Sequence, residues 1–241
     1  MSETPPAHKT AVCISGRCHS LQYTYLNIRQ TILDPLGDYD LFMYVPADDF
    51  SHHARLLNPT VLKVAADRPI DEGQLVNHEN CRFKTGVQAY LQQLYALKMC
   101  NRLRVRHARR SGTAYDWVVR CRPDLFFLNS LPELSTLDPA YVYLPDFHHF
   151  DGCNDRFAIG SSDKMDVYFN KFDDIHDYVS RVFDQRGVAV SAEMFTIGHL
   201  SLNRIETRTL PIRFNRVRDY GMRNDLNKTN RKVKTAPPLA V

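Results

Sequence analysis

The chain has 241 residues, of which 44% are hydrophobic and 24% charged, and its formal net charge is +4. These values are typical of globular proteins, and they exclude a disordered chain, a collagen and a small disulfide-stapled scaffold. No apolar run approaches the ~18 residues that a membrane span needs. The opening residues, MSETPPAHKT, lack the apolar stretch of a signal peptide.

The six cysteines are scattered along the chain, and none forms a C-x-x-C pair. Their spacing therefore argues against a zinc ribbon or a thioredoxin-type site. Cys13 and Cys121 lie in apolar, strand-like runs, where a thiol behaves as a small hydrophobe. Because no secretion signal is present, we expect six reduced thiols in a reducing compartment and predict a cytoplasmic protein.

Short apolar runs alternate with helical patterns through the first half of the chain. The runs predict strands over residues 9–15, 39–45, 60–65 and 115–121. Apolar residues at spacings of three and four predict helices over residues 21–36 and 83–110, with a short helix near 52–57. Pro35 and Gly37 are expected to end the first of these helices.

The second half continues the alternation with shorter pieces. Strands are expected over residues 141–144, 156–159, 206–210 and 212–217, and helices over 162–183 and 191–202. This order predicts an α/β fold with a mostly parallel central sheet flanked by helices on both faces. We expect one domain over residues 1–217 and a basic tail over 218–241. Ligands of such sheets bind beyond the carboxyl ends of the strands.

The first predicted strand ends in Ser15-Gly16-Arg17. A glycine at this point lets a backbone approach a ligand closely, and the helix that follows offers free N–H groups to an anion. Arg17 adds a fixed charge suited to phosphate. Neither a G-x-G-x-x-G nor a P-loop pattern is present, so an ordinary strand-to-helix turn with a surface arginine is the alternative.

The strand at 115–121 runs into Arg120-Cys121-Arg122-Pro123-Asp124, which is the most informative stretch of the chain. Two arginines two residues apart on a strand point the same way. Burying both is costly unless an anion is present. A carboxylate beside them suits a divalent metal that itself holds phosphates. Arg120, Arg122 and Asp124 therefore predict a site for a diphosphate and a metal, with a local Arg–Asp ion pair as the alternative.

A loop over residues 146–156 gathers carboxylates, an amide and two histidines. Such loops carry function more often than packing. Asp151 and Asp155 are candidates for binding sugar hydroxyls or a second metal contact, and His148 and His149 are expected to face solvent or substrate. Glu193 opens the last helix, where it is either a catalytic acid or a capping device, with Ser191 as the expected N-cap.

Basic residues gather in two places. Residues 213–234 hold eight Lys and Arg against two Asp, which is a net charge of +6 and leaves −2 for the remainder. We favour a solubilising tail there, with peripheral membrane contact as the alternative. Along the long helix, Lys98, Arg102, Arg106 and Arg109 form a stripe that we interpret as a solvated face and not a nucleic-acid surface. Gln93 and Lys98, near its start, are placed in the cleft.

Two stretches, Val12-Cys-Ile-Ser-Gly-Arg17 and Tyr115-Asp-Trp-Val-Val-Arg-Cys-Arg-Pro-Asp-Leu125, resemble small GT-A-type nucleotide-sugar glycosyltransferases of bacterial polysaccharide clusters and large algal viruses. Further matching features are Gln93, Tyr95, Leu97 and Cys100, the segment 154–161 and the pair Ala192-Glu193. Together they cover most of residues 10–217.

The resemblance implies a Rossmann-like GT-A fold, a UDP- or GDP-sugar donor with UDP favoured, a glycan acceptor, and Mn²⁺ or Mg²⁺ held by an Asp-x-Asp motif. Here that motif reads Arg122-Pro123-Asp124, so only its second aspartate is present. The implied metal ligand is Asp124. The implied donor nucleotide-binding residues are Ser15, Gly16, Arg17, Gln93, Lys98, Arg120 and Arg122. Asp151 and Asn154 would bind the sugar, and Asp155 and Glu193 would be catalytic.

The sequence leaves two alternative functions open. A sugar-phosphate nucleotidyltransferase shares the sheet and the metal chemistry, but it normally has a longer glycine-rich first loop than residues 15–20. A non-catalytic polyanion-binding module would use the tail and the helix stripe, and its binding would depend steeply on salt. We expect no nucleic-acid partner, since the chain has a single Trp and no aromatic-studded basic groove.

Overall fold

A computed structural model describes residues 9–76, 81–83, 86–218 and 221–223. Its main sheet has seven strands in the order β3-β2-β1-β4-β7-β6-β8. The strands are β1 (Thr10–Ser15), β2 (Tyr39–Pro46), β3 (Val61–Ala65), β4 (Trp117–Cys121), β6 (Val142–Pro145), β7 (Ala158–Ser161) and β8 (Thr207–Leu210). β7 runs antiparallel to β4 and β6, and the other pairings are parallel. The predicted α/β fold with a mostly parallel sheet is confirmed.

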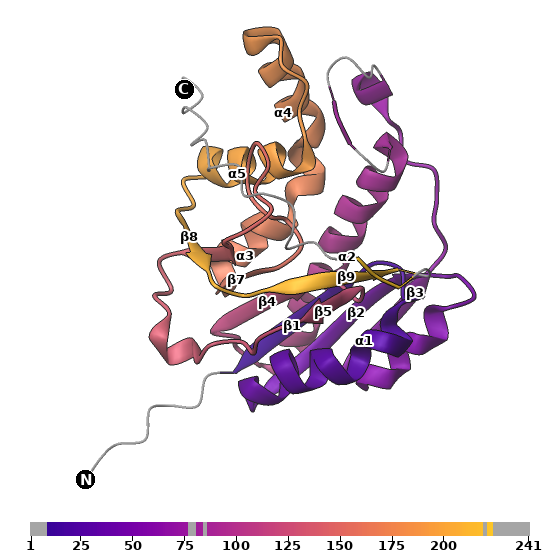
Figure 1. Cartoon of the computed structure of the whole chain (residues 1–241). Helices are drawn as coiled ribbons and strands as arrows, with labels where there is room; N and C mark the ends of the chain where they lie inside the picture. Colours follow the sequence, from indigo (N-terminus) through magenta and orange to yellow (C-terminus); the bar gives the residue numbers. More distant parts are fainter. Residues whose placement is uncertain (1–8, 77–80, 84–85, 219–220, 224–241) are drawn as a thin grey trace.

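Helices cover both faces of this sheet (Figure 1). On one face lie α2 (Val87–Ser111), α3 (Ser162–Phe169), α4 (Lys171–Arg186) and α5 (Ala192–Leu202). The other face carries α1 (Leu21–Ile28) and a small antiparallel sheet of β5 (Leu125–Phe127), β9 (Phe214–Arg218) and β10 (Gly221–Arg223). Neighbouring side chains of β1 divide between the two cores, with Ala11 and Cys13 in one and Val12 and Ile14 in the other. This explains why the strands are continuously apolar.

Several predicted elements differ in detail from the observed ones. The predicted helix over 21–36 is α1 followed by a π-helical turn, Arg29–Leu33, and a 3-10 turn, Asp34–Leu36. The predicted helix over 162–183 is two helices, α3 and α4, which meet at Asn170. β5 was not predicted, because three residues are too few for a periodic signal. Further 3-10 turns cover Ser51–Leu57, Gly73–Val76 and Leu134–Thr136.

All six cysteines are free and buried in the described structure. Free thiols were expected for all six, and apolar surroundings were expected for Cys13 and Cys121. Among the described residues, no helix combines the length and the apolar character needed to cross a membrane. Most of the predicted basic tail, residues 218–241, lies outside the described residues. Arg218 is the last residue of β9, so it belongs structurally to the domain and not to the tail.

Candidate functional site

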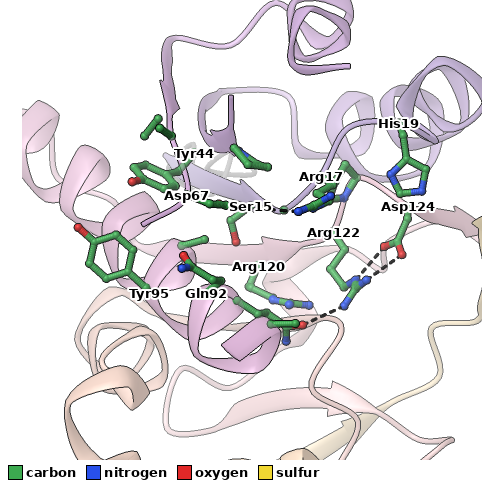
Figure 2. A pocket seen from close by; sticks show the side chains of 18 of the residues that line it. Ser15, Arg17, His19, Tyr44, Asp67, Gln92, Tyr95, Arg120, Arg122 and Asp124 are labelled. Carbon is green, nitrogen blue, oxygen red and sulfur yellow. Dashed lines mark hydrogen bonds and ion pairs between the residues drawn. The ribbon is translucent and has the colours of Figure 1, made fainter. Parts of the chain in front are cut away.

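A pocket of about 300 Å³ opens at the carboxyl ends of β1 to β4, at the edge of the sheet where ligands were expected (Figure 2). The turn after β1, the ends of β2 and β3, the start of α2, the end of β4 and the last residue of β9 all contribute to it. Its main polar lining residues are Ser15, Arg17, His19, Tyr44, Asp67, Gln92, Gln93, Tyr95, Arg120, Arg122, Asp124 and Arg218. The two tyrosines lie at one end, and Arg122 and Asp124 lie at the other.

The turn after β1 brings the backbone to the pocket wall. Gly16 has φ of +124°, a conformation that residues with a side chain rarely adopt. The ring of Pro123 lies 3.6 Å from the position that a Cβ on Gly16 would occupy. Ser15 is buried beside it, and Arg17 is exposed, with its guanidinium 3.4 Å from the carboxylate of Asp67. The structure therefore places all three predicted residues of this turn on the pocket.

Arg120 on β4 is the most unusual residue of the pocket. Its side chain is only 1% exposed, yet its Nε and Nη1 have no hydrogen-bond partner among the described residues. A buried charge without partners is strongly unfavourable unless a ligand supplies the missing contacts. Because Arg120 lines the pocket, its unpaired donors indicate a position for an anion.

Asp124 is held by two arginines. Arg122 donates from Nε to Oδ1 at 2.7 Å and from Nη2 to Oδ2 at 2.8 Å. Arg218 also forms an ion pair with Oδ2. Burial alone would raise the pKa of Asp124, but the two arginines outweigh it and hold the pKa well below its usual range. The carboxylate is thus ionised and both of its oxygens are engaged. The local Arg–Asp ion pair, an alternative at the sequence level, is present inside the pocket.

The pocket as a whole is positively charged. Its charged lining residues are four arginines, Arg17, Arg120, Arg122 and Arg218, and two aspartates, Asp67 and Asp124. The lining therefore carries a net charge of +2. Three of the arginines are wholly or mostly buried, and low-dielectric surroundings strengthen their attraction for an anion.

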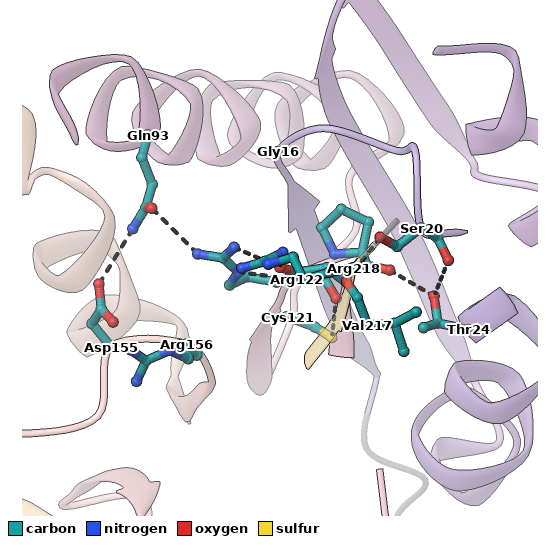
Figure 3. Close-up of polar contacts among 12 residues, drawn as sticks. Gly16, Ser20, Thr24, Gln93, Cys121, Arg122, Asp155, Arg156, Val217 and Arg218 are labelled. Atoms are coloured by element: carbon teal, nitrogen blue, oxygen red, sulfur yellow. Dashed lines mark hydrogen bonds and ion pairs between the residues drawn. The ribbon is translucent and has the colours of Figure 1, made fainter. Parts of the chain in front are cut away.

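Gln93 on α2 connects this pocket to a second group of buried charges (Figure 3). Its Oε1 accepts from Arg122 at 3.3 Å, and its Nε2 donates to Oδ2 of Asp155 at 3.2 Å. Burial would raise the pKa of Asp155, but Arg156, Arg120 and Lys171 lower it below the usual value. Asp155 is therefore an ionised carboxylate behind the pocket, and it does not itself line it.

The other predicted residues occupy different positions. Asn154 is fully buried and fixes its own loop, donating to the Phe147 carbonyl at 3.0 Å and accepting from the Arg156 N–H at 3.1 Å. Its side chain thus holds the loop together, and its assignment to the sugar site stays a prediction. Asp151 is half exposed and lies 3.9 Å from Arg82. Neither residue lines the pocket.

Glu193 lies in the first turn of α5 and pairs with Arg156 at 3.4 Å. Ser191 is the N-cap of that helix, as predicted, and accepts from the Met194 N–H. Lys98 lies outside the pocket, because its ammonium pairs with Asp173 of α4. It lines a second, open hollow along α2, together with Arg102, Arg106, Arg109 and Arg110. The structure therefore does not bring Lys98 together with the predicted nucleotide-binding residues that line the first pocket.

A divalent metal does not suit the residues of this pocket. Within the part of the chain that the structure describes, no three His, Cys, Asp or Glu side chains are grouped so that they could hold one ion. Asp124, the predicted ligand, gives both of its oxygens to arginines. Arg122 occupies the position where an Asp-x-Asp motif would supply its other carboxylate.

Several pocket residues were not identified from the sequence. Arg218 was assigned to the tail, and its membership of a basic cluster was the only signal it gave. Tyr44 and Tyr95 lie on β2 and α2, with ring centroids 6.4 Å apart. Tyr44 belongs to an apolar run, and Tyr95 was noted only as a feature of the resemblance. Arg68 stacks on Tyr95 at 4.8 Å and donates to its hydroxyl at 2.9 Å. Only the tertiary structure brings Tyr44 and Tyr95 together at one end of the pocket.

Comparison with known domain families matches residues 6–218 to a domain of unknown function, DUF7796, and the chain belongs to that family. Comparison with curated proteins finds no match. The matched segment includes every pocket residue described above and ends at Arg218.

Proposed function

We propose that this member of the family is a glycosyltransferase of the GT-A type, which moves a sugar from a nucleotide-diphosphate sugar to a glycan acceptor. A UDP-sugar is the favoured donor. The observation that carries the proposal is Arg120, a buried guanidinium with two nitrogens, Nε and Nη1, that have no hydrogen-bond partner among the described residues, in a pocket at the carboxyl edge of the sheet. A diphosphate supplies the oxygens that such donors need.

The two ends of the pocket suit the two ends of a nucleotide. Tyr44 and Tyr95 form an aromatic wall at the end near β2 and β3, where we place the nucleoside (Figure 2). Asp67 provides a carboxylate that can accept from ribose hydroxyls. Arg120 and Arg122 lie further along, where we place the diphosphate. This orientation directs the sugar toward Gln93 and the loop over residues 146–155.

In the proposed reaction the bond between the anomeric carbon and the diphosphate oxygen breaks, and its electron pair stays on the diphosphate. The acceptor hydroxyl oxygen bonds to the anomeric carbon and loses its proton. The diphosphate gains one negative charge in this step. Arg120, Arg122 and Arg218 are fixed beside it before the reaction, and such preorganised charges lower the barrier by stabilising the charge that develops.

The two candidate catalytic carboxylates, Asp155 and Glu193, have different roles in this scheme. Asp155 is ionised and has a lowered pKa, so it is a weak base. It suits electrostatic stabilisation of a cationic sugar centre, and Gln93 fixes its position. Glu193 is the remaining candidate for accepting the acceptor proton, although its pairing with Arg156 also fits a structural role at the start of α5.

The experiment is a calorimetric binding series with uridine, UMP, UDP and the matching GDP series, followed by an assay for nucleotide release from a panel of nucleotide sugars. We expect affinity to rise with each phosphate, most strongly with the second. Release of UDP from a UDP-sugar supports the transferase. Equal affinity for uridine and UDP would contradict a diphosphate site. Formation of UTP and a sugar phosphate on adding pyrophosphate would instead indicate a nucleotidyltransferase.

A polyanion-binding module is a second candidate, favoured by one observation. Arg102, Arg106, Arg109 and Arg110 line one open hollow along α2. Binding of heparin to this hollow would weaken steeply with salt and would not depend on Arg120. A chain that binds heparin and shows no response to any nucleotide would support this candidate over the transferase.

A further inference from the structure

We infer that the diphosphate of the donor is neutralised by the four pocket arginines without a divalent metal, and that Asp124 is a positioning residue for Arg122 and Arg218 and not a metal ligand. The inference rests on the proposed function, since it concerns the requirements of the same donor site. It departs from the Mn²⁺ or Mg²⁺ requirement that the sequence resemblance implies.

The first argument is the state of the Asp124 carboxylate. Oδ1 accepts from Arg122, and Oδ2 accepts from both Arg122 and Arg218. A metal ion at either oxygen would have to displace a guanidinium and then lie beside two positive charges. Both effects oppose metal binding, because like charges repel strongly in partly buried surroundings.

The second argument is the lack of partner ligands. A metal bound with a diphosphate usually keeps one or two protein carboxylates. The nearest acidic side chains have other partners, since Asp67 pairs with Arg17 and Asp155 accepts from Gln93. Gln93 bridges Asp155 and Arg122 by hydrogen bonds, and Asp155 does not line the pocket (Figure 3).

The third argument is charge balance. The diphosphate of a nucleotide sugar carries two negative charges, one on each phosphate. The charged residues lining the pocket amount to +2, from four arginines and two aspartates. The protein alone therefore matches the ligand, and the unpaired Nε and Nη1 of Arg120 provide directed contacts to it. A divalent cation would leave the same pocket with an excess of positive charge.

Hydrogen bonds to the backbone fix the group formed by Asp124, Arg122 and Arg218, here called the clamp, before a ligand binds. The Val217 N–H donates to the Asp124 carbonyl at 2.9 Å, and the Ser20 hydroxyl donates to the Val217 carbonyl at 2.9 Å. The Thr24 hydroxyl donates to the Pro123 carbonyl at 2.6 Å (Figure 3). These bonds connect the end of β9 to the start of α1 and to the loop after β4. Arg218 thus reaches Asp124 from a fixed strand, which suits a permanent structural clamp.

The test measures UDP binding by calorimetry in EDTA and again in excess MnCl₂. We expect dissociation constants that agree within about threefold, where a metal-bridged site would lose 100-fold or more on chelation. Binding that appears only with Mn²⁺ would overturn this inference and leave the proposed function standing. No binding of any nucleotide in either buffer would overturn the proposed function itself.

Substitutions in the pocket provide a second, independent test of the same inference. Arg218→Gln should weaken UDP binding in EDTA at least tenfold, whereas Arg55→Gln, which removes the same charge from an exposed site outside the pocket, should not. Asp124→Asn should still bind UDP in EDTA, because its side-chain oxygen can still accept from a guanidinium and hold it in position. Thermal melting confirms that each variant is folded. If Asp124→Asn does not fold, Arg218→Gln in EDTA decides. Unchanged UDP affinity of folded Arg218→Gln would contradict the inference.

Discussion

The Arg218 guanidinium pairs with the Asp124 carboxylate across 94 residues of sequence, and this ion pair joins β9, the central strand of the small sheet, to the loop that follows β4. Arg122 also donates to both oxygens of the same carboxylate. The consequence is a carboxylate that orients two arginines along one wall of a pocket. Arg120, which lacks such a partner, lies in the same pocket and is the residue whose removal is most informative.

Replacing Arg120 with Met should weaken UDP binding strongly and have a smaller effect on the stability of the fold. The variant loses the two unpaired buried donors, so UDP binding should weaken by about 3 kcal/mol, which is more than 100-fold. Its unfolding free energy should fall less than that of a variant at a hydrogen-bonded buried arginine, since Nε and Nη1 have no hydrogen bonds to lose and only the attraction to Asp155 is removed. Calorimetry with UDP and urea denaturation measure the two quantities.

The matched control for Arg120 is Arg156→Met, which also removes a buried guanidinium of this region. Arg156 has a partner in Glu193, so its loss breaks a buried ion pair and should lower the unfolding free energy by about 3 kcal/mol. Equal destabilisation by the two variants would mean that Arg120 is an ordinary structural arginine.

Gly16→Ala should weaken both stability and nucleotide binding. An alanine at φ of +124° is strained, and the cost is about 1–3 kcal/mol of unfolding free energy. The strain also moves the backbone at the pocket wall, so UDP affinity should fall at least several-fold. Gly112→Ala is the control, because Gly112 has φ of +71° at the far end of α2 and open space around it. It should lower stability and leave UDP affinity unchanged.

Gly152→Ala should destabilise the loop over residues 146–155. A Cβ at this position would lie 2.0 Å from the backbone carbonyl oxygen of Glu193, so the loop and the start of α5 would have to separate. We expect a loss of about 3 kcal/mol in unfolding free energy, typical of a severe overpacking change. Thermal and urea denaturation measure it. A melting temperature equal to that of the wild type would show that loop and helix are not held at this distance in solution.

Lys171 predicts a pH dependence of stability. Its ammonium is buried and donates to the Thr196 hydroxyl at 3.0 Å, and burial lowers its pKa from 10.5 to about 8. Between pH 8 and 10.5 the unfolded chain therefore binds more protons than the folded chain, and this group makes stability rise with pH.

Lys171→Met lacks that titration and serves as the reference for it. The unfolding free energy of the wild type, relative to the variant, should rise by about 3 kcal/mol as pH increases through this window. Urea denaturation of both proteins at several pH values gives the difference. A difference that stays constant with pH would show that the Lys171 pKa is not lowered in the folded state.

The predicted elements that matched the structure are those with a local signal. The apolar runs at β1, β2 and β4 are continuous because helices cover both faces of the sheet, and this alone indicates an α/β fold. The arginines at 120 and 122 were expected to face one way from strand geometry, and both line the pocket. Lys98 could not be placed in this way, because its ion-pair partner Asp173 lies 75 residues away in the sequence. Asn154 bonds to Phe147 and Arg156 of its own loop, and an irregular loop has no periodic signal.

The amino-acid sequence predicts the fold class, the edge of the sheet where the pocket lies, and the positive charge at the end of β4, because strand and helix periodicity depend on neighbouring residues. The position of Arg218 beside Asp124, and the engagement of both Asp124 oxygens, are visible only in the folded chain. They depend on the contact between β9 and the loop that follows β4. Packing between segments nearly a hundred residues apart leaves no periodic trace in the chain.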